Sequence, residues 1–239
     1  MTVLLSSDHE QIYSDIRSQL MNVVNMEQVI DVFSYSMYFD KEIYSEPKYL
    51  KDTRYAALEV AAREIYHNHV YGAIAECGVY RGNFSCMMSR LMPDRKLYLF
   101  DTFEGFDEKD NTGVSDENFA FNSALDSFDF RNTSVQLVLN KIGSYIDTVV
   151  RKGYFPETAK GLEEETFDFV SLDTDIYKPI LSGLEFFWPR LSRGGYIFIH
   201  DFASLPGVRR AVFEFCQRTH IGYVRLPDIN HSIVLSKPL

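Results

Sequence analysis

Short apolar runs recur along the chain from residue 70 onward, and amphipathic stretches separate them. The runs are Ala73–Ala75, Lys96–Phe100, Asp147–Val150, Phe167–Leu172 and Tyr196–Ile199. Strands that are buried on both faces read as continuous apolar runs, and helical segments between them supply the crossovers of a parallel sheet. The pattern predicts an α/β fold with a mostly parallel sheet and helices on both faces.

Two of the intervening stretches have the pattern of helices that pack on a sheet. One follows Pro179, a favourable residue in the first turn of a helix, and carries apolar residues along one face. We expect the pair Gly194-Gly195 to end it. The other begins after Pro206 with the same kind of apolar face.

The last part of the chain has the pattern of a hairpin. Two apolar runs, 221–226 and 232–235, are separated by Pro227-Asp228-Ile229-Asn230, whose composition favours a turn. We therefore expect the sheet to end in an antiparallel pair of strands.

The first 68 residues follow a different rhythm. From about Glu10 to Asn68, apolar residues recur at steps of three and four, which is typical of helices, and Pro47 separates two such stretches. We expect residues 1–68 to form a helical cap or lid on a single domain of residues 1–239. Because aromatic, partly apolar helices suit a lid and a subunit interface equally, a homo-oligomer is one expectation.

The charge pattern excludes one class of function. The chain has 34 acidic and 24 basic residues and a net charge of −10, and its Lys and Arg are scattered along the sequence. A surface that tracks nucleic-acid phosphates needs basic residues gathered on one face. Nucleic acid is therefore not an expected partner.

Nothing in the sequence indicates export or membrane insertion. The N-terminus lacks a basic stretch followed by a long apolar run, and no window approaches the ~20 apolar residues of a membrane span. We expect a cytoplasmic protein without membrane contact. Cys77, Cys86 and Cys216 are too few for a disulfide framework and match no zinc-site spacing, so we expect free thiols in the core or beside the site.

The turn after the first sheet strand indicates a cofactor site. It begins at Glu76, and Gly78 and Gly82 let the backbone pass close to a ligand before a helix begins at residues 83–85. The third glycine of the dinucleotide fingerprint has no counterpart, and Glu76 would repel a diphosphate. A cationic sulfonium with an amino-acid tail tolerates that charge. Asp101, which ends the second strand, stands where an acidic group hydrogen-bonds a ribose.

Further acidic residues end the fourth and fifth strands. Asp173 and Asp175 share one side of their strand, and Asp201 ends the neighbouring strand, so these side chains should converge. Converging carboxylates repel one another unless a cation or a shared proton holds them, and a hard divalent cation is the simplest resolution. In the alternative interpretation, Asp175 and Asp201 cap the helices that follow. His200 could ligate the ion, orient Asp201 or fill the strand interior.

Five stretches of the sequence, taken together in their order, are a more specific signal than any one of them alone. They are Glu76–Gly82, Leu99–Phe106, Gly153–Thr158, Leu172–Tyr177 and Phe187–Tyr196. Running in this order between about Arg54 and Gln217, they resemble the macrocin-type sugar O-methyltransferases, which methylate deoxysugars of macrolide and aminocoumarin antibiotics.

The resemblance implies a class I methyltransferase fold, which is Rossmann-like, with S-adenosylmethionine as cofactor and a sugar-like hydroxyl as acceptor. It places the adenine near Gly153 and Tyr154. The other cofactor residues that we infer are Glu76, Gly78, Arg81, Gly82, Ser85, Asp101 and Thr102.

The same resemblance implies a magnesium-type ion on Asp173 and on the acidic pair after the fifth strand, with Asp175 as the catalytic base. The best-known members have Asp-Asp at that pair, whereas this chain has His200-Asp201, one carboxylate fewer.

Several hypotheses follow. The leading one is metal-assisted O-methyl transfer, and a metal-independent methyltransferase of the same fold is its closest alternative. A nucleotide-dependent oxidoreductase and a non-catalytic module that binds S-adenosylmethionine are the others.

Overall fold

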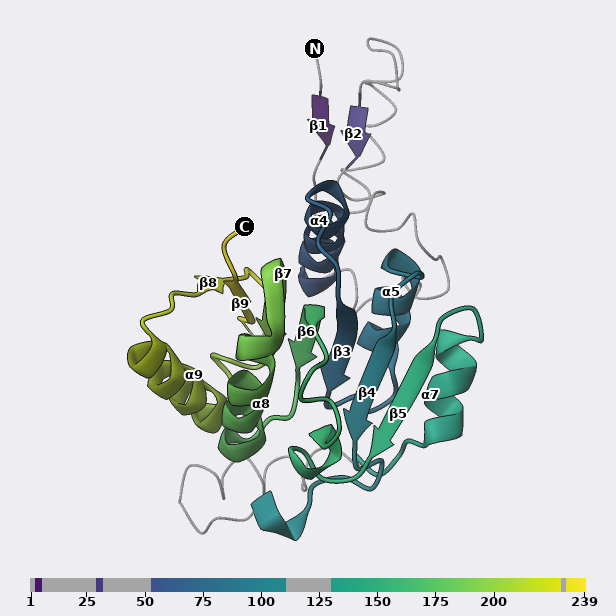
Figure 1. The fold of residues 1–239 in the computed structure, drawn as a ribbon, viewed down its shortest axis with the longest axis vertical. Coiled ribbons are helices and arrows are strands. Elements are labelled where there is room, and N and C mark those ends of the chain that lie inside the picture. The colour runs from purple at the N-terminus through teal and green to yellow at the C-terminus, as the bar shows by residue number, and fades with distance from the viewer. Residues whose placement is uncertain (1–2, 6–28, 32–52, 111–129, 229–230) are drawn as a thin grey trace. The chain divides into compact units, whose positions relative to one another are not determined.

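The structure, a computed structural model, describes residues 3–5, 29–31, 53–110, 130–228 and 231–239 (Figure 1). The chain divides into two compact units, Met1–Lys51 and Asp52–Leu239. The prediction that residues 1–68 form a cap within a single domain stays a prediction.

The first unit contains a short pair of parallel strands, β1 (Val3–Leu5) and β2 (Val29–Asp31). The helical pattern predicted from Glu10 onward is therefore wrong at β2. Val29 and Ile30 are β-branched residues, which favour extended backbone once a partner strand is present. The predicted helix around residues 12–23 lies outside the described residues.

The second unit is built on a seven-stranded sheet with the order β5-β4-β3-β6-β7-β9-β8. Strands β3 to β7 run parallel, and β9 runs antiparallel to β7 and to β8, which confirms the predicted parallel sheet and terminal hairpin. The strands are β3 (Ala73–Cys77), β4 (Leu97–Asp101), β5 (Thr148–Lys152), β6 (Phe167–Leu172), β7 (Leu191–Ile199), β8 (Val224–Arg225) and β9 (Ile233–Ser236).

Helices cover both faces of this sheet (Figure 1). Helices α8 and α9 pack together on one face, over a core that includes Ala75, Cys77 and Leu172. On the other face α5 packs against α4 and α7, and its Phe84 contacts Phe169 of β6. The helices are α4 (Arg54–His67), α5 (Asn83–Leu91), α7 (Val135–Ile142), α8 (Tyr177–Arg190) and α9 (Pro206–Thr219), with 3₁₀ turns η3 (Glu108–Asp110) and η4 (Glu157–Ala159).

One predicted boundary is wrong. Helix α8 ends at Arg190, not at Gly194-Gly195, because the chain enters β7 directly at Leu191. The register of β7 against β6 shifts between Leu191 and Tyr196, and Gly194 has a φ of 80° inside that irregularity. The glycine pair therefore forms a bulge in the strand, where a left-handed residue is needed, and does not stop the helix.

The order of the strands reverses at β3, which has β4 on one side and β6 on the other. In open parallel sheets the crevice for a ligand lies outside the carboxyl ends of the strands at such a reversal. Successive residues of β3 face opposite sides, so Cys77 turns toward α8 and α9 while Glu76 turns toward α5. The fold thus directs Glu76, Asp101 and Asp173 to one edge.

Cys77, Cys86 and Cys216 are all free thiols, the first two buried and the third half-buried. None of the helices in the described ranges combines the length and apolar character that a membrane span requires.

Candidate functional site

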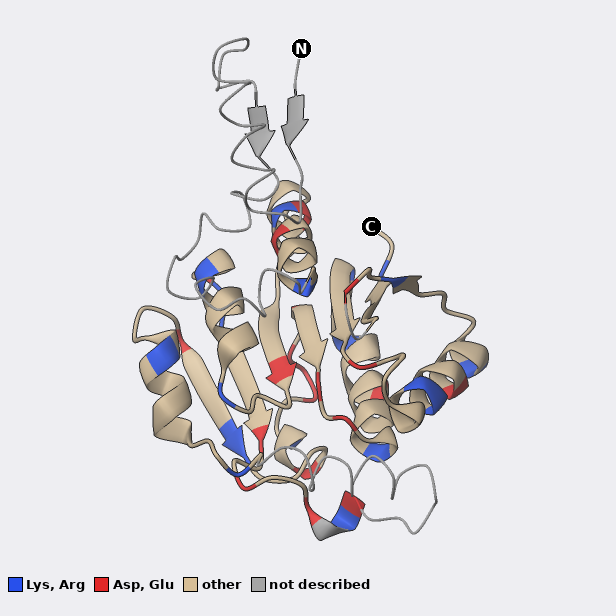
Figure 2. Ribbon diagram, turned by 180° about the vertical axis from the view of Figure 1, so that it is seen from behind, with Lys and Arg blue, Asp and Glu red and all other residues tan. Residues whose placement is uncertain are grey.

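Acidic residues gather at the carboxyl ends of the central strands (Figure 2). Glu76 of β3 is the most deeply placed, with 2% of its surface exposed, and the Ser85 hydroxyl donates a hydrogen bond to Glu76 Oε2. Burial raises the pKa of Glu76 to about 8, although Ser85 and Arg54 oppose the shift. Ser85, a predicted cofactor residue, therefore contacts Glu76 in the protein as it stands.

The turn after β3 is fixed by glycines. Gly78 and Gly82 have φ angles of 83° and 69°, in the left-handed region that glycine enters freely. Gly82 is the N-cap of α5, and a Cβ at this position would stand 2.8 Å from Val138. The two glycine positions of the predicted cofactor turn thus have no room for a side chain, Gly78 against the Asp173 backbone and Gly82 against Val138. Arg81 beside it is exposed, and its carbonyl accepts a hydrogen bond from Lys141.

The Asp101 carboxylate connects this turn to the end of β4. Its Oδ2 accepts hydrogen bonds from the backbone N–H groups of Val79 and Tyr80 at 2.7 and 2.8 Å, and its Oδ1 accepts one from Phe103 at 2.6 Å. A carboxylate oxygen offers two lone-pair sites, so Asp101 can still accept hydrogen bonds from a ribose. Asp101 therefore shapes the loops around the predicted cofactor position.

Asp173, His200 and Asp201 form a compact cluster. His200 Nδ1 lies 2.8 Å from Asp173 Oδ1 and 2.8 Å from Asp201 Oδ2. The second oxygen of Asp173 lies 3.2 Å from the guanidinium of Arg54, at the start of α4. The predicted convergence of Asp173 and Asp201 is present, with one basic side chain between them and another beside them.

These contacts set the charges of the cluster. Burial alone would raise the pKa of Asp173, but His200 and Arg54 outweigh it and hold that pKa at about 2. Burial would lower the pKa of His200, but Asp173 and Asp201 together raise it to about 10. The Asp173 carboxylate and the His200 imidazolium are therefore both charged at neutral pH, beside the guanidinium of Arg54.

Asp175 lies beside this cluster in a left-handed backbone conformation with a φ of 62°, and Asp201 has a φ of 54°. Such angles are uncommon for residues other than glycine and collect at functional sites. Burial and the charges of Asp201 and Asp173 raise the pKa of Asp175 well above its ordinary value, and His200 opposes them.

The alternative interpretation of Asp175 and Asp201 as helix caps is wrong. The N-cap residues of α8 and α9 are Ile176 and Leu205, and neither helix has a side-chain cap hydrogen bond. Asp175 and Asp201 are therefore not the N-cap residues of the helices that follow them.

The segment after β5 forms the other side of the predicted cofactor region. The Gly153 N–H donates to the Asp101 carbonyl at 2.9 Å, which joins the ends of β4 and β5. The Tyr154 hydroxyl donates to Asp110 Oδ1 at 3.0 Å, and both side chains are buried. Burial raises the pKa of Asp110 to about 6, against the Tyr154 hydrogen bond. Thr102 is engaged with the Gly105 carbonyl at 2.5 Å.

The predicted metal ligands fit a magnesium-type ion poorly. Asp173, His200 and Asp201 do offer atoms within 4.8 Å of one another. Mg²⁺ demands oxygen ligands, however, and a His200 Nδ1 that donates a proton to carboxylates cannot ligate. The positive charge of Arg54 at 3.2 Å from Asp173 Oδ2 would also repel a cation.

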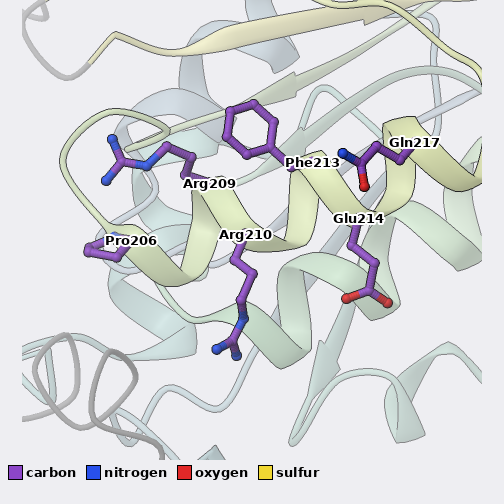
Figure 3. Close-up of a pocket in the computed structure, with 6 residues that line it drawn as sticks. All are labelled: Pro206, Arg209, Arg210, Phe213, Glu214 and Gln217. Atoms are coloured by element: carbon purple, nitrogen blue, oxygen red, sulfur yellow. The ribbon is translucent and has the colours of Figure 1, made fainter.

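A surface hollow of about 470 Å³ lies along α9 (Figure 3). All of its lining residues belong to that one helix, and none ends a strand. The lining residues are Pro206, Arg209, Arg210, Phe213, Glu214 and Gln217. The hollow shares no residue with the acidic cluster.

Comparison with known families decides the chemistry. The family model of macrocin O-methyltransferase (TylF) matches residues 11–233, nearly the whole chain. The chain belongs to this family. This macrocin-type protein is therefore an S-adenosylmethionine-dependent O-methyltransferase, and the oxidoreductase and the non-catalytic module are set aside.

Curated relatives agree with the family. The chain is 25% identical over 244 residues to the 8-demethyl-8-(2,3-dimethoxy-alpha-L-rhamnosyl)-tetracenomycin-C 4'-O-methyltransferase of Streptomyces olivaceus, covering 91% of this chain and 89% of that protein. It is 27% identical to the demethyldecarbamoylnovobiocin O-methyltransferase of Streptomyces niveus, covering 64% of this chain and 61% of that protein. The match to the mycinamicin III 3''-O-methyltransferase of Micromonospora griseorubida is also 27%, over 64% and 63%.

Solved structures support the predicted fold. The O-methyltransferase NovP superposes with a TM-score of 0.69 at 18% identity, covering 95% of this chain and 100% of that one. The calicheamicin methyltransferase CalS11 gives a TM-score of 0.52 at 17% identity, covering 97% and 93%. The class I methyltransferase fold is confirmed.

Sequence reasoning missed Arg54 and Asp110. Arg54 is separated from Asp173 by 119 residues, and no local pattern relates a basic residue at a helix start to a distant strand end. Asp110 lies in a polar stretch that reads as surface loop, yet it is 5% exposed. The buried partner Tyr154 was the available signal, because a buried tyrosine hydroxyl usually has a hydrogen-bond partner.

Proposed function

We propose that this methyltransferase transfers the methyl group of S-adenosylmethionine to a hydroxyl of a deoxysugar that is part of a larger small molecule. The observation that carries the proposal is the convergence of Glu76, Asp101 and the Asp173–Asp201 cluster at the strand-order reversal of the sheet. The printed names of the relatives support the acceptor class, since one of them acts on a rhamnosyl-tetracenomycin and CalS11 is called a TDP-rhamnose 3'-O-methyltransferase.

The residues of the turn suit the cofactor. Gly78 and Gly82 add no side chain at their own positions in the turn, and Asp101 retains acceptor capacity for ribose hydroxyls. The Glu76 carboxyl faces the same crevice and would ionise against the ammonium of the amino-acid tail. Arg81, Ser85, Thr102, Gly153 and Tyr154 complete the proposed cofactor region.

Asp175 is the proposed base. When bound, S-adenosylmethionine supplies a methyl group on a sulfonium, and the electron pair of the broken C–S bond stays on sulfur in S-adenosylhomocysteine. Asp175 takes the proton from the acceptor hydroxyl as its oxygen attacks the methyl carbon. Residues at the strand ends would hold the cofactor and the acceptor close together, which would remove much of the entropic barrier.

The divalent cation that the sequence predicts at Asp173, His200 and Asp201 stays a prediction. The geometry favours the metal-independent version of the same reaction, because His200 and Arg54 already contact the carboxylates that the ion would need. The cytoplasmic location and the homo-oligomer also stay predictions.

The proposal is tested by binding and by product analysis. Calorimetric titration with S-adenosylhomocysteine should show saturable binding, and isotope-labelled S-adenosylmethionine should label deoxysugar-bearing macrolides or aromatic polyketides but not their aglycones. Absence of binding would overturn the cofactor, and label found in an aglycone would overturn the sugar acceptor.

A further inference from the structure

The carboxylates of Asp173 and Asp201 carry their own counter-charges. His200 Nδ1 lies between them, at 2.8 Å from an oxygen of each, and Arg54 occupies the second oxygen of Asp173. The side chains of Arg54, His200 and Asp201 are 11%, 13% and 16% exposed, so water screens these charges little. Like charges in such a setting need compensation, and here side chains supply it.

Neighbouring aromatic side chains hold the guanidinium of Arg54 in place. It begins α4, its guanidinium lies 5.3 Å from the centroid of the Phe84 ring on α5, and Phe84 in turn contacts Tyr55 with centroids 5.4 Å apart. A guanidinium over an aromatic face is held by cation–π attraction and loses little freedom on pairing. A permanently charged group is thereby fixed beside Asp173.

We propose that Arg54 and His200 take the place of a divalent cation in this methyltransferase, so that its strand-end carboxylates are organised without a metal ion. The inference rests on the proposed function for its catalytic meaning, but the cation site itself is defined by Asp173, Asp201 and the groups that contact them. Arg54 neutralises Asp173, and the Nδ1–H of His200 bridges the two carboxylates. Arg54 is a positioning residue that acts through Asp173.

The first experiment measures cation binding to the full chain in the absence of cofactor. Calorimetric titrations with Mg²⁺, Mn²⁺ and Zn²⁺ should show no saturable site in the wild-type protein, and electron paramagnetic resonance should show Mn²⁺ remaining free. Saturable binding of one ion per chain with a micromolar Kd would overturn the proposal. Zn²⁺ is included because imidazole and carboxylate together suit that ion.

A single substitution should turn the cluster of Asp173, His200 and Asp201 into a cation-binding site. His200→Asp supplies the third oxygen ligand group and removes the bridging proton, so we expect this variant to bind Mn²⁺ saturably. His220→Asp is the matched control, because His220 is an exposed residue in left-handed backbone at the end of α9, and it should bind no more Mn²⁺ than wild type. A His200→Asp variant that binds no better than wild type would contradict the assignment of His200 to the place of the ion.

The role of Arg54 is tested by charge. In the His200→Asp background, Arg54→Gln should increase Mn²⁺ affinity by about tenfold because a repulsive charge is lost, whereas Arg54→Lys should leave that affinity unchanged. Arg218→Gln, which breaks an exposed pair with Glu185, is the control and should change nothing. Equal Mn²⁺ affinity in His200→Asp with and without Arg54→Gln would overturn the role of Arg54.

Circular dichroism and S-adenosylhomocysteine titration of each variant separate these results from misfolding and from failure of the proposed function. Absence of S-adenosylhomocysteine binding to the wild-type protein counts against the proposed cofactor. Cation binding to the wild-type protein counts against the replacement of the ion by Arg54 and His200.

Discussion

The carbonyl oxygen of Asp173 lies 1.9 Å from the point at which a Cβ atom on Gly78 would stand. The turn after β3 therefore passes directly against the end of β6, and the N–H of Asp173 donates to the Cys77 carbonyl at 2.8 Å. This hydrogen bond joins the end of β3 to the residue that follows β6, at the strand-order reversal. It also brings the predicted cofactor turn against the acidic cluster.

Gly78→Ala should destabilise the protein by about 2–4 kcal/mol, since the added methyl group meets backbone and the φ of 83° is strained for alanine. Gly161→Ala is the matched control, because Gly161 has a φ of 86° with nothing near its Cβ position, and it should cost about 1 kcal/mol. Urea unfolding measures both values. Equal losses in the two variants would show that the backbone contact with Asp173 carries no energy.

Asp101→Asn should weaken both the protein and its cofactor affinity. Asn keeps only one of the two acceptor oxygens, so the variant loses either the bonds from Val79 and Tyr80 or the one from Phe103, and we expect a loss of about 1.5–3 kcal/mol. Thermal unfolding and titration with S-adenosylhomocysteine should both respond, the latter with affinity reduced about tenfold or more. Asp147→Asn, at an exposed site before β5, should leave both unchanged.

Glu76 makes the stability of the protein depend on pH. Because burial raises its pKa from 4.5 to about 8, the folded state holds a proton that the unfolded state releases as the pH rises. Its contribution to stability is fully present below pH 4.5 and is lost as the pH rises through about 8. The charges of Asp173 and Asp101 add to the rise in the pKa of Glu76, whereas Arg54 opposes it.

Glu76→Gln removes this titration while it keeps an acceptor for Ser85. The variant should match wild type near pH 4.5 and exceed its free energy of unfolding by about 3–5 kcal/mol above pH 8. Glu104→Gln, at an exposed ion pair with Lys152, is the control and should follow wild type at every pH. Parallel curves for wild type and Glu76→Gln would contradict the assignment of the pH dependence to Glu76.

Asp175→Asn should separate binding from turnover. The substitution keeps the size of the side chain but removes the proton acceptor, so S-adenosylhomocysteine affinity should stay within about twofold while methyl transfer falls roughly 100-fold or more. Labelled S-adenosylmethionine and any glycoside that accepts the label measure the second quantity. Unchanged turnover would remove Asp175 from the mechanism.

Much of the sheet could be predicted because each strand is a local pattern. Phe167–Leu172 is a continuous apolar run that matches β6 residue for residue, and the polar residues after each run mark the crevice. Glycine was harder to interpret, since Gly194-Gly195 is a helix terminator by its position but a strand bulge once β7 is paired with β6. Tertiary pairing decided that case.

The site was predictable to the extent that parallel strands end at one edge. This rule located Asp173, Asp175 and Asp201, but it says nothing of a basic residue that arrives from a helix on the face of the sheet. Arg54 reaches Asp173 through the packing of α4 against α5, which depends on three-dimensional contacts. The metal prediction combined the carboxylates with His200 and omitted the positive charge of Arg54.

The pair of Arg54 and Asp173 also bears on the order of folding. The contact spans 119 residues and includes the pairing of β3 with β6 between its ends, and His200 follows a further crossover and β7. Such non-local closure is slow compared with helix formation. During synthesis, the guanidinium emerges from the ribosome long before its carboxylate partner exists, so the cluster is completed only after the chain through Asp201 has been made.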